Sequence, residues 1–240
     1  MRRLPKPGRF SKDLKAKLKE ETDAIRKAAN SKAEAERRYD NARQTQWFKP
    51  VVDKLKRLSG RGQRCMYCSG SEASDVEHYR PKAVFPLLAM TWENYLWICT
   101  PCNRHKGNRF PPTTEPGGEF VNPLQEDVWQ FFFIDEFGFL SPLYDRNLGI
   151  LNPRGVSTRD FIDLNREAVQ QSRQARLKDL KNQARDVIRK LKSNQISKAA
   201  AMRKIHEWRR QPFQPDVADY FFNGPGKLES PFKELLRRLY

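Results

Sequence analysis

Apolar residues before position 60 are sparse and recur every three or four residues, which is the spacing of one helix face. Between residues 11 and 45 the members of this series are Leu14, Leu18, Ile25, Ala28 and Ala29. Asn30-Ser31 interrupts the series, and Ser31 with Glu34 matches a capping box that restarts a helix. Residues 47–58 predict another amphipathic helix, which ends at Ser59-Gly60.

The pattern changes after residue 112. Residues 129–140 hold an aromatic run broken by Asp135-Glu136-Phe137-Gly138, which predicts a strand, a turn and a second strand. Residues 165–192 return to helical spacing, and their apolar stripe consists of Leu177, Leu180, Ala184, Val187 and Leu191. Residues 196–210 predict another helix. Ser230-Pro231, an N-cap residue followed by proline, predicts the start of a short helix that runs to Tyr240.

The net charge of the chain bears on the kind of molecule that it binds. The 240 residues carry a formal net charge of +17, which is typical of a protein with a polyanionic partner such as nucleic acid; the alternative is a merely solvated basic surface. The charge is uneven: residues 116–164 have three basic and eight acidic side chains, whereas residues 165–210 have 14 basic and four acidic ones. The basic stripe beside the apolar one at residues 178–192 either follows a nucleic-acid backbone or is a solvated helix face.

The sequence predicts where in the cell the chain is found. The basic first ten residues lack the apolar core of a signal peptide, and no apolar run approaches the roughly 18 residues of a membrane helix. We therefore expect a cytoplasmic protein without membrane contact, in which thiols stay reduced.

The cysteines indicate a metal site. Cys65-x-x-Cys68 and Cys99-x-x-Cys102 are two CxxC motifs (knuckles) separated by 30 residues, and together they can give zinc four thiolates. Such a zinc has no open position and is structural; the alternative is four buried free cysteines.

A second kind of chemistry lies between the knuckles. Residues 75–82 alternate in the manner of a strand, which puts Glu77 on one face and His78 on the other. A carboxylate suits Mg²⁺ or Mn²⁺, and a neutral histidine can take a proton from the attacking water. Taken alone, this short string is also typical of a surface histidine in a salt bridge.

The residues around the second knuckle make the pattern more specific. Asn94 precedes it, and Asn103-Arg104-His105-Lys106-Gly107 follows it directly. With Glu77-His78, these residues resemble the HNH endonuclease motif, a ββα-metal fold in its zinc-bearing form, over roughly residues 61–112.

The resemblance implies a role for each matching position. His78 is the general base, Glu77 the acidic metal ligand, and Asn94 the residue that orients the base. Asn103 is the second metal ligand, with His105 as a competing candidate, and Lys106 lies near the scissile phosphate. The basic side chains around this site either grip phosphates or balance Asp75 and Glu93; they are Arg80, Lys82, Arg104 and Arg109.

A narrower resemblance covers most of the chain. Residues 75–82, 92–96 and 102–110, with Asn122-Pro123, Leu151-Asn152-Pro153 and Leu164-Asn165-Arg166, are similar to one bacterial HNH subfamily. That subfamily contains the PtuB nucleases of Septu anti-phage systems, also found beside retrons. It implies a defence nuclease in complex with an ABC-type ATPase of the PtuA kind.

The sequence thus predicts an α+β chain in three parts. Residues 1–60 form a helical extension, residues 61–115 the nuclease core with its four-cysteine zinc, and residues 116–240 a β-hairpin with helices for partner or nucleic-acid contact. The predicted function is metal-dependent cleavage of phosphodiester bonds, with DNA favoured as substrate. Two alternatives stay open: a nuclease for RNA such as tRNA, and a zinc-stapled nucleic-acid-binding module that does not cut.

Overall fold

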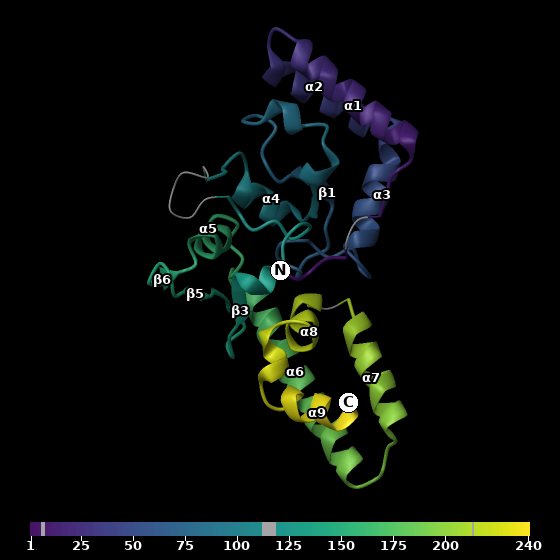
Figure 1. The fold of residues 1–240 in the computed structure, drawn as a ribbon, viewed down its shortest axis with the longest axis vertical. Coiled ribbons are helices and arrows are strands. Elements are labelled where there is room, and N and C mark those ends of the chain that lie inside the picture. The colour runs from purple at the N-terminus through teal and green to yellow at the C-terminus, as the bar shows by residue number, and fades with distance from the viewer. Residues whose placement is uncertain (6–7, 112–118, 213) are drawn as a thin grey trace.

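Helices dominate the computed structural model, which describes residues 1–5, 8–111, 119–212 and 214–240. Figure 1 shows N-terminal helices at one end, a small strand-and-helix unit in the middle and the C-terminal helices at the other end. The prediction of a mixed α and β chain is confirmed, and the three-part division stays a prediction. Within the described residues, no helix has the length and apolar character needed to cross a membrane.

The N-terminal helices form a hairpin that packs over the central unit. Helix α1 is Lys12–Lys27, α2 is Ser31–Arg43 and α3 is Lys49–Leu58, with the short 3-10 helix η1 at Gln46–Phe48. The predicted break between the first two helices is confirmed. The capping residue is Asn30 rather than Ser31, because the Asn30 side-chain oxygen accepts from the Ala33 N–H at 3.1 Å.

The central unit is an antiparallel pair of strands followed at once by a helix. Strand β1 (Asp75–His78) pairs with β2 (Tyr95–Ile98), and helix α4 (Thr100–Lys106) begins two residues later. Val76 and His78 are buried while Asp75 and Glu77 are half-buried, so the predicted alternation is confirmed. Gly107, at φ 50°, ends α4 in the left-handed region that glycine adopts at low cost.

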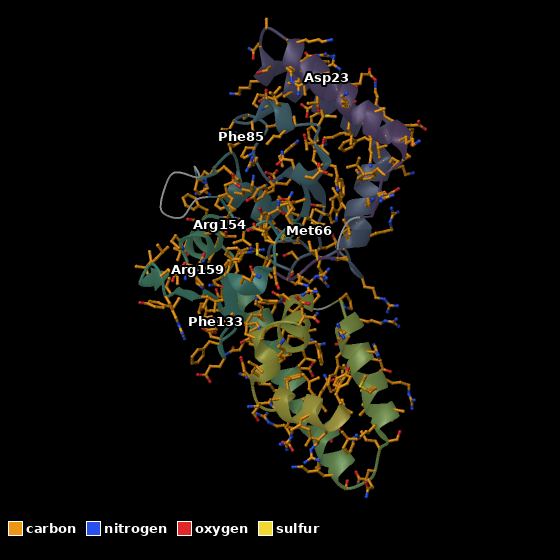
Figure 2. All side chains as sticks on the ribbon, viewed as in Figure 1. Asp23, Met66, Phe85, Phe133, Arg154 and Arg159 are labelled. Atoms are coloured by element: carbon orange, nitrogen blue, oxygen red, sulfur yellow. The ribbon has the colours of Figure 1, made fainter. Side chains whose placement is uncertain are left out.

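The connection between β1 and β2 packs against the N-terminal helical hairpin. It contains the 3-10 helices η2 (Pro86–Leu88) and η3 (Trp92–Asn94), and η2 packs against both α1 and α2. Figure 2 shows Phe85 near this connection, below the N-terminal hairpin, and Met66 near the middle of the molecule.

Two further hairpins follow. After η4 (Val128–Gln130), strand β3 (Phe132–Ile134) pairs with β4 (Leu140–Pro142), which confirms the predicted strand, turn and strand. Strand β5 (Tyr144–Asp145) pairs with β6 (Ile150–Leu151), and α5 is Pro153–Phe161. Gly138 turns the first hairpin at φ 85°, and a Cβ there would lie 2.5 Å from the Gln170 carbonyl oxygen.

The C-terminal helices form the second large body. They are α6 (Glu167–Lys192), α7 (Lys198–Arg210), α8 (Pro215–Phe222) and α9 (Phe232–Leu239), with η5 at Pro225–Leu228. The predicted apolar stripe of α6 is buried except for Leu191, which is partly exposed. The prediction of Ser230 as N-cap is wrong by one residue: α9 begins at Phe232, and its cap residue is Pro231, which makes no side-chain cap hydrogen bond.

A buried ion pair joins α6 to α8. The Arg173 Nε lies 3.0 Å from the Asp216 Oδ2, and both side chains are fully buried. The second arm of the guanidinium donates to the Leu164 carbonyl oxygen at 2.9 Å, and the Met1 amino group also donates to Asp216. Because the carboxylate is sealed from water, its charge depends on these donors.

Replacing Arg173 with leucine should lower the free energy of unfolding by about 3 kcal/mol, since the buried Asp216 carboxylate loses its guanidinium partner. Equilibrium unfolding in urea measures the change. Arg185→Leu, at an exposed position of the same helix, is the matched control and should change stability by less than about 0.5 kcal/mol. Equal losses in the two variants would contradict the assigned role of the pair.

Candidate functional site

The four cysteines converge at the base of the central unit. All four are buried, and their sulfur atoms lie within 4.8 Å of one another. The Sγ atoms of Cys68 and Cys99 are 3.8 Å apart. Four thiolates at the usual zinc–sulfur distance of about 2.3 Å have the same spacing of roughly 3.8 Å, so the cluster fits a tetrahedral zinc ion.

Local backbone geometry brings the two knuckles together. Ser69, at φ 58°, closes the first knuckle, and its N–H donates to the Cys65 carbonyl oxygen at 2.9 Å. The Met66 N–H donates to the Trp97 carbonyl oxygen at 3.0 Å, which fixes this knuckle to β2. The second knuckle opens α4, where Cys99 is the N-cap. Hydrogen bonds from the Cys102 and Cys65 thiols lower the pKa of Cys99 to about 7, whereas burial raises the pKa of Cys65.

His78 stands at the end of β1 with one ring nitrogen already engaged. Its Nε2 lies 2.9 Å from the Ala89 carbonyl oxygen, to which the Tyr95 hydroxyl also donates at 2.7 Å. Because a carbonyl oxygen only accepts, Nε2 must carry the hydrogen. The neutral imidazole therefore keeps its free lone pair on Nδ1, which is the protonation state of a general base.

Aromatic walls enclose this imidazole. The Tyr39 ring of α2 lies 4.4 Å from the His78 ring and the Tyr95 ring 5.3 Å from it, both edge-on. The Tyr39 hydroxyl donates to the Val76 carbonyl oxygen at 3.0 Å, which ties α2 to β1. The side chain of His78 is only 4% exposed, and this burial lowers its pKa to about 3. His78 is therefore neutral across the physiological range.

Glu77, on the opposite face of β1, is paired with a buried lysine. The Lys106 Nζ donates to Glu77 Oε1 and to the His78 carbonyl oxygen, both at 2.7 Å, and Lys106 is fully buried. Burial raises the pKa of Glu77, and the positive charge of Lys106 opposes that rise. Burial likewise lowers the pKa of Lys106 against the attraction of Glu77. The lysine thus points at the carboxylate, and its contact with a phosphate stays a prediction.

The Asn94 side chain holds two parts of the β1–β2 connection together by hydrogen bonds to the backbone of Arg80 and Leu88. Its Nδ2 donates to the Arg80 and Leu88 carbonyl oxygens at 2.9 and 3.0 Å, and its Oδ1 accepts from the Arg80 N–H at 2.7 Å. Leu88 immediately precedes Ala89, whose carbonyl oxygen holds His78. The asparagine therefore fixes the backbone that orients the imidazole.

Helix α4 presents Asn103 and His105 to different surroundings. Asn103 precedes Lys106 by three residues, so both lie on one helix face, and that face looks toward Glu77. The Nε2 of His105 instead lies 3.5 Å from the Asp163 carboxylate, beyond the end of α5. Helical spacing thus puts Asn103 on the side of α4 that carries the Lys106 contact to Glu77, whereas the structure places His105 beside Asp163.

The four predicted phosphate contacts differ in their surroundings. Arg80 pairs with Glu119, and the Lys82 ammonium lies 5.3 Å from the centre of the Tyr39 ring. Arg109 donates to the His105 carbonyl oxygen, and to that of Phe161 at 3.4 Å. Arg104 is exposed on α4. Arg80 and Arg109 therefore already have partners within the chain.

The sequence did not single out two of the groups that hold His78. Tyr39 lies in a helix more than thirty residues before the motif, and only its aromatic character on a polar helix could have drawn attention to it. The Ala89 carbonyl oxygen has no signature in the sequence, because every residue carries one.

Comparison with known proteins gives a partial match. No family model matches the chain. The chain is 38% identical over 66 residues to Septu protein PtuB of Bacillus thuringiensis, covering 25% of each protein. It is 29% identical over 107 residues to Septu protein PtuB of Bacillus mycoides (strain KBAB4), covering 32% of this chain and 36% of that protein. The alignments span about a quarter and about a third of these curated relatives, so the similarity supports a PtuB-like relationship for part of the chain.

The burial of His78 predicts acid-sensitive folding. The unfolded chain binds a proton at this histidine below pH of about 6.5, whereas the folded protein does so only near its lowered pKa of about 3. Stability from neutral His78 is therefore complete above the higher value and is lost as the pH falls between the two, at up to about 1.4 kcal/mol per pH unit.

Urea unfolding of wild type and His78→Gln across this range measures the effect. The difference in stability between them should shift in favour of the glutamine variant as the pH falls. The matched control is His206→Gln, which changes an exposed histidine of α7 and should have a nearly constant effect. A wild-type-to-His78→Gln difference that does not vary with pH would show that the imidazole is not held neutral by burial.

Proposed function

We propose that this chain is a divalent-metal-dependent endonuclease of the HNH type that hydrolyses phosphodiester bonds in nucleic acid. The observation that carries the proposal is the state of His78: its Nε2 donates to the Ala89 carbonyl oxygen, which leaves Nδ1 as the free base, and Glu77 immediately precedes it on the same strand. The strand, strand and helix order of β1, β2 and α4 supports it, since this is the order of the ββα-metal fold.

In this proposal Glu77 and Asn103 hold Mg²⁺ or Mn²⁺. A carboxylate and an amide oxygen are hard ligands of the type that such cations take from proteins. When bound, the cation would stabilise the charge that develops on the phosphate and the leaving oxygen. Asn103 is preferred to His105 because it shares the helix face of Lys106, whereas His105 lies beside Asp163.

The chain's own residues perform the proton chemistry. His78 Nδ1 accepts a proton from the attacking water, and the Nε2 hydrogen bond to Ala89 keeps the ring oriented while Nδ1 becomes protonated. Asn94 holds the backbone on which that orientation depends. Lys106 stabilises the ionised form of Glu77 against the burial that raises its pKa, so the carboxylate stays available as a ligand.

The partial similarity to PtuB supports the wider setting that we propose. The chain would serve as the effector nuclease of a Septu-type anti-phage complex with an ABC-type ATPase. The net charge of +17 favours nucleic acid as the substrate, with DNA preferred and RNA such as tRNA as the alternative. The four cysteines would hold a structural zinc ion.

One observation favours a second candidate function. His78 is 4% exposed, and its pKa of about 3 makes it a weaker base than the ideal group near pH 7. A zinc-stapled module that binds nucleic acid without cutting would need no reactive imidazole. The two functions make opposite predictions for a substitution at His78.

Replacing His78 with alanine should reduce cleavage by about 10²- to 10⁴-fold, because the attacking water loses its proton acceptor. Cleavage of labelled DNA and RNA is measured with Mg²⁺ or Mn²⁺, with and without the partner ATPase. His206→Ala, at an exposed histidine, is the control and should cleave like the wild type. Equal cleavage by His78→Ala and the wild type excludes His78 as the base. Binding without any cleavage by the wild type supports the second candidate.

The same assay separates the two candidates for the second ligand. Asn103→Ala should raise the Mn²⁺ concentration needed for half-maximal cleavage, and His105→Ala should leave it nearly unchanged. The reverse result would assign the ligand to His105.

Purified protein should contain about one zinc ion per chain, since four thiolates complete one tetrahedral site. Elemental analysis after gel filtration measures the metal, and Cys65→Ser should lower the content. The serine variant His206→Ser, outside the cluster, should keep it. Folded wild-type protein that contains no zinc would rule out the metal site while leaving the nuclease assay intact.

A further inference from the structure

Arg166 lies at the cysteine cluster but belongs to the C-terminal body. It is the N-cap residue of α6, more than sixty positions after the second knuckle. Its Nη1 lies 3.5 Å from Cys102 Sγ and its Nη2 lies 3.7 Å from Cys99 Sγ. Both arms of one guanidinium are thus within hydrogen-bonding distance of the two sulfur atoms of the second knuckle.

The charge of the cluster explains why a guanidinium suits this place. Four thiolates around a zinc dication carry a net charge of −2, and all four cysteines are buried. A buried charge without compensating donors is costly. Arginine stays charged at any physiological pH and presents two parallel N–H donors, so one side chain can serve two sulfur atoms.

The residues next to Arg166 hold it in position. Leu164 is fully buried, and the Asn165 side chain makes a two-way bond to the backbone of Leu140 on β4, accepting at 2.8 Å and donating at 3.1 Å. The Asp163 carbonyl oxygen accepts from Arg166 Nη1 at 3.1 Å, which orients the guanidinium. Leu164-Asn165-Arg166 therefore connects the core, the β3–β4 hairpin and the cysteine cluster in three consecutive residues.

We infer that Arg166 is a positioning residue for the zinc site: it donates hydrogen bonds to the metal-bound sulfurs of Cys99 and Cys102 and so couples zinc binding to the docking of α6. The inference rests on the zinc site proposed above. It assigns a role to a residue outside both knuckles and outside the β1–β2–α4 unit. In this role Arg166 acts through the cysteine sulfurs and not as a metal ligand.

A purely structural role is the competing explanation. Arg166 also donates to Asp163, and it could serve only to shape the turn before α6. In that case its loss would lower the stability of the chain equally with and without zinc. If the contacts to the cysteine sulfurs matter, the loss of stability on replacing Arg166 must be larger with zinc than without it.

The test compares Arg166→Gln and Arg166→Lys with the wild type. Arg166→Gln removes the charge and the planar pair of donors, and Arg166→Lys keeps a charged donor but loses the planar pair. The control is Arg146→Gln, which changes an exposed arginine in the turn between β5 and β6. Zinc affinity is measured by competition with a chromophoric chelator. We expect affinity about 10- to 100-fold weaker in Arg166→Gln, a smaller loss in Arg166→Lys and no change in the control.

A second measurement uses the full chain loaded with Co²⁺ in place of zinc. Losing N–H donors raises the energy of the sulfur lone pairs, so the sulfur-to-cobalt absorption band of Arg166→Gln should move to longer wavelength. This readout reports on the sulfurs themselves, and a change confined to the turn before α6 would not move it. Arg166→Lys, which keeps a cation nearby, should give a smaller shift in the same direction.

The outcomes separate this inference from the proposals before it. Wild type that holds no zinc overturns the zinc site and the role of Arg166 together. Wild type that holds zinc, with unchanged affinity and cobalt spectrum in Arg166→Gln, overturns the role of Arg166 alone. If Arg166→Gln does not fold, the affinity and spectrum of Arg166→Lys decide, and wild-type values in both would also overturn the role. Weaker affinity together with the spectral shift supports it.

Discussion

The convergence of four cysteine sulfurs is the constraint on which the rest of the site depends. The cluster binds the start of α4 to the segment before β1, and the Met66 N–H extends that link to β2. Once α4 is fixed against the strands, Lys106 can reach Glu77 from the far end of the same helix. Two strands of four residues and a helix of seven are too short to hold such a geometry by themselves. These short elements therefore depend on contacts beyond their own hydrogen bonds, namely the cysteine cluster and the buried apolar residues that pack around it.

The parts that the sequence predicted well are those set by local chemistry. The paired knuckles, the alternation of Glu77 and His78, the break near Asn30 and the hairpin around Gly138 all follow from spacing or backbone preference over a few residues. The structure bears them out. Fold class followed for the same reason, since helical and strand periods differ along the chain.

The parts that the sequence could not predict depend on contacts between distant segments. Tyr39 meets His78 across nearly forty residues, and Arg166 meets Cys102 across more than sixty. The hydrogen bond to the Ala89 carbonyl oxygen involves backbone alone, so no residue type marks it. The contact of Lys106 with Glu77 depends on burial that a motif does not encode, and its contact with a phosphate stays a prediction. The predicted boundary at residue 115 lies outside the described residues.

The wall that Tyr39 forms beside His78 has a consequence for how this protein could have been assembled. Its hydroxyl completes a hydrogen bond to β1 and its ring shields the imidazole, yet it comes from α2 rather than from the strand-and-helix unit. Cutting the chain at residue 60 would uncover the imidazole and leave the Val76 carbonyl oxygen without this donor. The β1–β2–α4 unit is therefore poorly suited to being transferred between proteins as an independent domain. Any exchange that preserved the buried state of the histidine would have to carry the helical hairpin with it.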